Sequence, residues 1–178
     1  VVTGATEVRT AGGVFYTPEW IVHEIIDRTL SPILKEKQPD KIKVLDLACG
    51  SGVFPVAVAE YLLKEAELRK GVSLSVAQKA QIIQQSVYCN DVDPVAAEAT
   101  MMWLYITMLE GGGAEARGFD LPDLSQNVRV GDALGLDHPF PEIEFNAVVG
   151  NPPYLRYRKI GEYLPEKIAF LKAHFQSF

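Results

Sequence analysis

The chain has 178 residues, of which 48% are hydrophobic and 22% are charged. This length and composition are typical of one globular domain with an apolar core, and they exclude a disordered, collagen-like or low-complexity chain. No apolar run reaches the roughly 18 residues that a membrane-spanning helix needs, and Val1–Gly13 lacks the basic-then-apolar pattern of a secretion signal. Cys49 and Cys89 are too few for a disulfide scaffold or a CxxC metal site, so we expect a reducing, cytoplasmic setting.

The net charge of −6 is unevenly distributed along the chain. Residues 1–150 carry 12 basic and 21 acidic side chains, whereas residues 151–178 carry five basic and two acidic ones. Because nucleic-acid affinity depends on Lys and Arg at the phosphates, the acidic part is a poor DNA-binding surface. We therefore expect phosphate contacts from Arg156, Arg158 and Lys159, for which a solvated charged face is the alternative.

Helical and strand patterns alternate along the chain. Thr17 is predicted to cap a first helix, with Pro18 at its first position, and apolar residues follow at helical spacing. Further helices are predicted over 54–70, 75–85 and 94–109, and strands over 42–47, 87–91, 127–130 and 145–150. This alternation predicts an α/β fold with a doubly wound, Rossmann-like sheet and helices on both faces, in which ligands bind at the carboxyl ends of the strands.

The first predicted strand runs into the glycine-rich segment DLACGSG at 46–52. Gly50 and Gly52 would let a ligand approach the backbone closely. The third glycine of the dinucleotide motif is absent and no GK[ST] follows, which weakens NAD and P-loop interpretations. Asp46 also suits a cationic ligand better than a pyrophosphate, although an ordinary tight turn remains the alternative.

Acidic residues follow the next two strands. Asp91 is placed to accept hydrogen bonds from ribose hydroxyls, whereas Asp93, directly before Pro94, is expected mainly to cap a helix. Asp132 could accept from an adenine amino group, with a plain turn as the alternative.

The strongest signal is NPPY at 151–154, after the strand FNAVVG. Two prolines stop both strand and helix, so the loop is rigid. It would offer an amide, carbonyl oxygens and an aromatic ring to a planar substrate that carries an NH₂ group.

Together these motifs resemble the adenine-N6 DNA methyltransferases of the gamma arrangement. GVFYTP at 13–18, DLACGSGVF at 46–54, NDVDP at 90–94, GDAL at 131–134 and NPPY at 151–154 occur in the order of that family. The opening GVFYTPEWIV is particularly similar to large restriction–modification and phage-defence enzymes, including Eco57I-like ones that fuse modification to cleavage.

The resemblance implies S-adenosylmethionine as the cofactor and no metal. The implied cofactor-binding residues are Tyr16, Thr17, Pro18, Asp46, Ala48, Gly50, Asp91, Asp132 and Ala133. The Asn151 side-chain oxygen and the Pro152 carbonyl would accept hydrogen bonds from the amino group of a flipped-out adenine, and Tyr154 would stack on that base.

Residues 1–178 are interpreted as one catalytic domain, with a first helix and cofactor motif at 13–35, a cofactor-binding core at 42–150, and a catalytic loop with a basic segment at 151–178. Few residues follow NPPY, so the target-recognition domain is expected to be absent and the fragment to be inefficient alone. The expected substrate is double-stranded DNA in a bacterial or archaeal cytoplasm, with a fused or associated endonuclease.

Three alternatives remain. A protein glutamine methyltransferase shares NPPY, but that family has a helical domain where GVFYTP stands here. An RNA adenine methyltransferase would use the same chemistry. A non-catalytic module that binds S-adenosylmethionine would retain the cofactor motifs without turnover.

Overall fold

The computed structural model describes residues 17–134, 139–152, 170, 172 and 173. Thr17–Asn151 forms one compact unit, and Val1–Tyr16 with Pro152–Phe178 forms a second. All the elements below belong to the first unit. No helix among the described residues is both long and apolar enough to cross a membrane.

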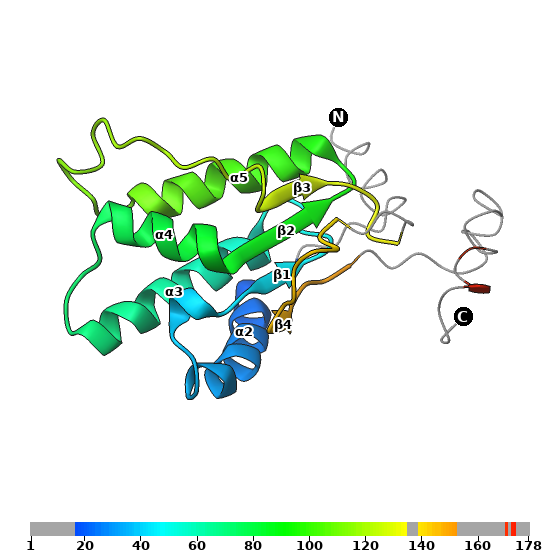
Figure 1. The fold of residues 1–178 in the computed structure, drawn as a ribbon, viewed down its shortest axis with the longest axis horizontal. Coiled ribbons are helices and arrows are strands. Elements are labelled where there is room, and N and C mark those ends of the chain that lie inside the picture. Colours follow the sequence, from blue (N-terminus) through cyan, green and yellow to red (C-terminus); the bar gives the residue numbers. More distant parts are fainter. Residues whose placement is uncertain (1–16, 135–138, 153–169, 171, 174–178) are drawn as a thin grey trace, which may run out of the picture. The chain divides into compact units, whose positions relative to one another are not determined.

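The first unit is built on a parallel sheet of four strands in the order β3-β2-β1-β4 (Figure 1). The strands are β1 (Val44–Asp46), β2 (Val87–Asp91), β3 (Val128–Val130) and β4 (Ala147–Val148). Val44 of β1 pairs with Val87 on one side and with Ala147 on the other. The chain moves outward from β1 to β3 and then returns to the far side of β1, so the strand order reverses between β1 and β4. Such a reversal is where open α/β sheets bind their ligands.

Helices connect the strands as the sequence predicts. They are α2 (Glu19–Leu34), α3 (Val53–Lys70), α4 (Val76–Ser86) and α5 (Pro94–Leu109), with a short 3₁₀ turn, η1 (Pro39–Lys41), before β1. Ser75 and Gln78 form a reciprocal capping box at the start of α4, which satisfies amides that the first turn cannot pair itself. Gly71, with φ of +69°, ends α3. The predicted α/β fold, with a parallel Rossmann-like sheet joined by helices, is confirmed.

One apolar core lies between the helices and one face of the sheet. Successive side chains of a strand point to opposite faces, and Val44, Val87, Cys89, Val128 and Ala147 belong to this core. Each helix contributes fully buried side chains to it, such as Ile26 of α2, Leu62 of α3, Ile83 of α4 and Leu104 of α5.

The opposite face of the sheet carries an aromatic cluster. The rings of Tyr88, Phe140 and Phe145 meet edge to face, with centroids 5.4–5.8 Å apart. The guanidinium of Arg129 lies 4.6 Å from the centre of the Phe140 ring, a favourable cation–π arrangement.

Several local predictions need correction. Helix α2 begins at Glu19 with Pro18 as its N-cap and no side-chain cap, so the prediction that Thr17 caps this helix is wrong. Its hydroxyl accepts instead from Asn151. Strands β1 and β4 are shorter than the predicted 42–47 and 145–150. At the start of β4, the Asn146 side chain, rather than a backbone carbonyl, accepts from the Lys43 amide.

Candidate active site

The sequence motifs meet at one edge of the sheet. Because all four strands are parallel, their carboxyl ends lie at the same edge, and the segments that follow them converge there. These segments are 47–52, 92–93, 131–134 and 149–151. The convergence that the sequence predicts at the strand ends is therefore present.

The glycine-rich turn after β1 depends on its missing side chains. Gly50 and Gly52 have φ of +54° and +94°, a region that favours glycine. A Cβ on Gly52 would lie 3.0 Å from the Thr100 hydroxyl oxygen and 3.2 Å from the Thr100 Cα, whereas a Cβ on Gly50 would meet nothing within 4 Å. Gly52 is thus needed for packing against α5, and open space lies beside Gly50.

Asp91 anchors this turn. One carboxylate oxygen accepts from the Gly50 amide at 2.7 Å, and the other accepts from the Asp93 amide at 2.9 Å. A carboxylate has about four acceptor sites, so Asp91 can also accept from a ligand. Asp93 caps α5 by accepting from the Val95 amide at 2.9 Å, as predicted.

Asp46, the last residue of β1, is a buried carboxyl with 4% exposure. Burial raises its pKa to about 7; the hydrogen bond from the Ala48 amide opposes this rise, and the Asp91 carboxylate adds to it. A cationic group beside Asp46 would favour its ionised form.

The segment after β4 packs directly on Asp46. A Cβ on Gly150 would lie 2.5 Å from Asp46 Oδ1, a distance that is sterically forbidden. This close approach lies between β1 and β4, where the strand order reverses.

Asn151 follows at once, and its side-chain nitrogen donates to the Thr17 hydroxyl at 3.0 Å. These residues are 134 positions apart in the chain, so the fold alone brings them together. This bond engages the amide nitrogen of Asn151, and the amide oxygen takes no part in it.

The other predicted site residues have simpler surroundings. Asp132 is exposed after β3 and accepts from the Leu134 amide at 3.0 Å, as in a turn. Ala48 and Ala133 are half-buried in their loops, while Pro18 and Pro152 are exposed. Tyr16, Tyr154, Arg156, Arg158 and Lys159 lie outside the described residues.

Sequence reasoning missed three features of this site. It did not give Gly150 or Asn90 a role, and it assigned the Thr17 hydroxyl to the wrong partner. A glycine directly before the NPPY motif was the available signal for Gly150. The Thr17 hydroxyl bonds to Asn151, and the Asn90 side chain bonds to the Leu47 and Gly131 carbonyls. These partners are far apart in the chain, so no local sequence pattern predicts them.

Comparison with known proteins identifies the family. The sequence model of the family "N-6 DNA Methylase" matches residues 3–165, and the chain belongs to that family. It is a methyltransferase-family domain with a Rossmann-like sheet.

Several curated proteins are similar to the chain. It is 28% identical to the type II restriction enzyme and methyltransferase RM.Eco57I of Escherichia coli, over 90% of this chain and 20% of that protein. It is 31% identical to the type I restriction enzyme MjaIX methylase subunit of Methanocaldococcus jannaschii, over 80% of this chain and 19% of that protein. It is 28% identical to the adenine-specific methyltransferase PglX of Streptomyces coelicolor, over 66% of this chain and 10% of that protein. The chain thus spans a fifth or less of the length of these relatives.

Proposed function

We propose that the chain is the catalytic domain of an S-adenosylmethionine-dependent methyltransferase that modifies the amino group of adenine in DNA. The proposal rests on family membership, on the names of the relatives, and above all on one contact, the bond from the Asn151 amide nitrogen to Thr17. That contact holds the Asn151 side chain by its nitrogen and would leave its oxygen to accept from an incoming N–H group.

The residues at the edge of the sheet fit this cofactor. The loop after β1 has open space beside Gly50, and the Gly50 amide is already bound by Asp91, so it is not available to a phosphate. Two carboxylates, Asp46 and Asp91, suit amino and hydroxyl groups and would repel a pyrophosphate. S-adenosylmethionine carries an ammonium group and ribose hydroxyls and, when bound, supplies an electrophilic methyl group.

We assign the ribose to Asp91 and the cationic end of the cofactor to the neighbourhood of Asp46. Ala48 and Gly50 would line the same pocket, and Asp132 with Ala133 would border the adenine of the cofactor. Tyr16, Thr17 and Pro18 complete the proposed cofactor set.

The protein would act on the substrate by orientation. An adenine amino nitrogen is a weak nucleophile because its lone pair is delocalised into the ring. The Asn151 oxygen and the Pro152 carbonyl would accept its two N–H bonds and favour the geometry in which the lone pair is directed outward. Tyr154 would stack on the base. Such fixed dipoles and positioning lower a barrier without a strong base.

The cofactor is tested by calorimetry with S-adenosylmethionine, with NAD as the control ligand. We expect heat only from the first. A folded chain that is silent to millimolar S-adenosylmethionine would contradict the proposal.

The substrate is tested by label transfer from S-adenosylmethionine to DNA, RNA and protein acceptors. The natural polypeptide that carries these residues should label DNA. Label in RNA or in a glutamine-containing protein, but not in DNA, would instead support one of the alternative methyltransferases. Cofactor binding without transfer to any acceptor would support the non-catalytic module.

The catalytic loop gives the sharpest prediction. Asn151→Ala should slow single-turnover transfer by about 100- to 1,000-fold, the usual cost of losing one preorganised polar contact to a reacting group, with cofactor affinity nearly unchanged. Thr17→Val should slow transfer by about tenfold because the amide loses one hydrogen bond, whereas Thr17→Ser keeps the acceptor and should retain activity. Near-normal transfer by Asn151→Ala would mean that the loop is only a structural turn.

A last part of the proposal concerns organisation. We propose that residues 1–178 work within a longer polypeptide or complex, as in relatives whose names join a methyltransferase to a restriction enzyme. Arg156, Arg158 and Lys159 would contact DNA phosphates beside the catalytic loop, with other parts of the assembly reading the target sequence.

A further inference from the structure

Asn90, the penultimate residue of β2, connects the loops on both sides of that strand. Its side chain is fully buried. The amide nitrogen donates to the Leu47 carbonyl at 3.3 Å and to the Gly131 carbonyl at 2.9 Å. Leu47 begins the loop after β1, and Gly131 begins the loop after β3. The Asn90 main-chain carbonyl also accepts from the Cys49 amide at 3.0 Å.

The side-chain oxygen of Asn90 indicates why an amide stands at this position. Among the described residues, Asn90 Oδ1 is a buried acceptor without a hydrogen-bond partner. Such an atom is costly, and an apolar side chain of the same shape would avoid the cost. Reversing the amide would turn its oxygen toward two carbonyl oxygens. The two N–H donors therefore fix the orientation and account for an amide at this position.

We propose that Asn90 is a positioning residue that ties the loop after β1 to the loop after β3. It holds the Asp46 side and the Asp132 side of the pocket at a fixed separation before a ligand enters. This tie, which consists of the hydrogen bonds from Asn90 to Leu47 and Gly131, is present in the ligand-free chain. Its effect on S-adenosylmethionine affinity rests on the proposed function.

The chain contains a matched control at the other end of β2. Asn127 is also buried, with 3% exposure. Its amide nitrogen likewise donates to two carbonyls, those of Gln84 and Val87, each at 2.8 Å. Val87 is the first residue of β2, so this second amide lies away from the pocket edge. Any general effect of losing a buried amide should appear in both variants.

The experiment compares Asn90→Leu with Asn127→Leu in the ligand-free chain by amide hydrogen exchange. The Cys49 and Gly131 amides, which bond to the Asn90 and Asp91 carbonyls, should exchange about tenfold faster in Asn90→Leu, as expected when hydrogen bonds that restrain both loops are lost. They should keep their wild-type rates in Asn127→Leu. The Val149 amide, bonded to the Leu45 carbonyl, serves as an internal reference.

The same variants are titrated with S-adenosylmethionine. Asn90→Leu should bind about tenfold more weakly, whereas Asn127→Leu should bind as the wild type does. Unchanged exchange at both loops in Asn90→Leu would overturn the tie, and so would equal effects of the two variants. If the wild-type chain does not bind S-adenosylmethionine, the proposed function fails, but the exchange comparison still decides the tie.

Asn90→Ser covers the case in which Asn90→Leu does not fold. Its single hydroxyl donor can serve at most one of the two carbonyls. One of the two loops should then exchange faster and the other should remain protected. Wild-type protection of both loops would overturn the proposal.

Discussion

Gly150 illustrates how one backbone position can couple two parts of a site. Gly150→Ala should lower the free energy of unfolding by about 1–3 kcal/mol, as inserted atoms do in packed regions, because its Cβ would lie 2.5 Å from Asp46 Oδ1. Urea denaturation measures the loss. Gly131→Ala is the matched control at another strand end, since a Cβ there would lie 3.4 Å from its nearest neighbour. Equal losses in the two variants would contradict this account.

Asp46 should make stability depend on pH. Its pKa in the folded chain is about 7, against 3.8 ordinarily, so the folded state holds the proton more tightly than the unfolded state. The contribution of Asp46 to the free energy of unfolding is full below about pH 4. It falls by up to about 4 kcal/mol as the pH rises to about 7.

Asp46→Asn keeps an acceptor for the Ala48 amide and cannot ionise. The stability of this variant relative to wild type should therefore rise between pH 4 and pH 7 and then level off in urea denaturation. Asp123→Asn is the control, because hydrogen bonds from the Ser125 amide and hydroxyl hold the pKa of Asp123 below its usual range. Its stability relative to wild type should fall as the pH rises to about 4 and stay flat between pH 4 and pH 7. A flat difference for Asp46→Asn would mean that water reaches this carboxyl.

At the scale of elements, two carboxylates between β2 and α5 have different roles. Asp91 holds the Gly50 amide, and Asp93 caps α5. Asp93→Ala should cost about 0.5–2 kcal/mol of stability through loss of the α5 cap, with little effect on cofactor affinity. Asp91→Ala should weaken S-adenosylmethionine binding more, because Asp91 is assigned to the ribose and also holds the Gly50 amide. Calorimetry and urea denaturation separate the two effects, and equal losses of affinity would contradict the assignment of the ribose to Asp91 rather than Asp93.

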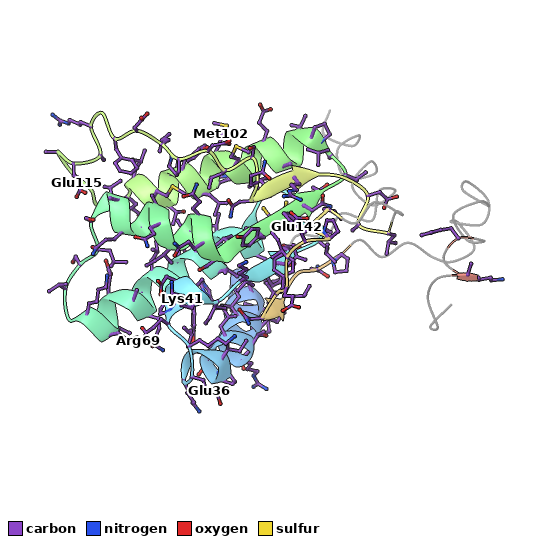
Figure 2. The ribbon with its side chains drawn as sticks, viewed as in Figure 1. Glu36, Lys41, Arg69, Met102, Glu115 and Glu142 are labelled. Carbon is purple, nitrogen blue, oxygen red and sulfur yellow. The ribbon has the colours of Figure 1, made fainter. Side chains whose placement is uncertain are left out.

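Helix α5 has several large apolar side chains that the rest of the fold does not bury. Helix α5 buries Leu104 but exposes Met102, Trp103 and Ile106, and Figure 2 shows Met102 on its outer side. Apolar periodicity predicted the existence and bounds of this helix correctly. It did not predict which apolar side chains would be exposed, because a helix that is apolar on most sides has no distinct buried face.

At the scale of the whole molecule, the proposed pocket exists only when four strand ends come together. A ligand that binds there should therefore stabilise the folded state alone. S-adenosylmethionine at about 100 times its dissociation constant should raise the free energy of unfolding by about 2.7 kcal/mol. NAD should give no shift in the same thermal or urea experiment. An equal shift from both ligands would indicate binding unrelated to the proposed pocket.

The sequence by itself determined the elements and their order. The bounds of β2 and α5 match the prediction, because caps, prolines and apolar periodicity are properties of neighbouring residues. The motifs also predicted that the candidate residues meet at one edge of the sheet, since the carboxyl ends of parallel strands lie on the same side. The cap assigned to Thr17 failed because a hydroxyl next to a helix start can accept from any donor that the fold brings near it.

Only the tertiary structure decided the contacts across the sheet. It brought the Asn151 amide to Thr17, seated Gly150 on Asp46, and joined two loops through Asn90. It also raised the pKa of Asp46, because that shift arises mainly from burial. Such features depend on strand register and on distance through space, and residue spacing along the chain carries no record of either.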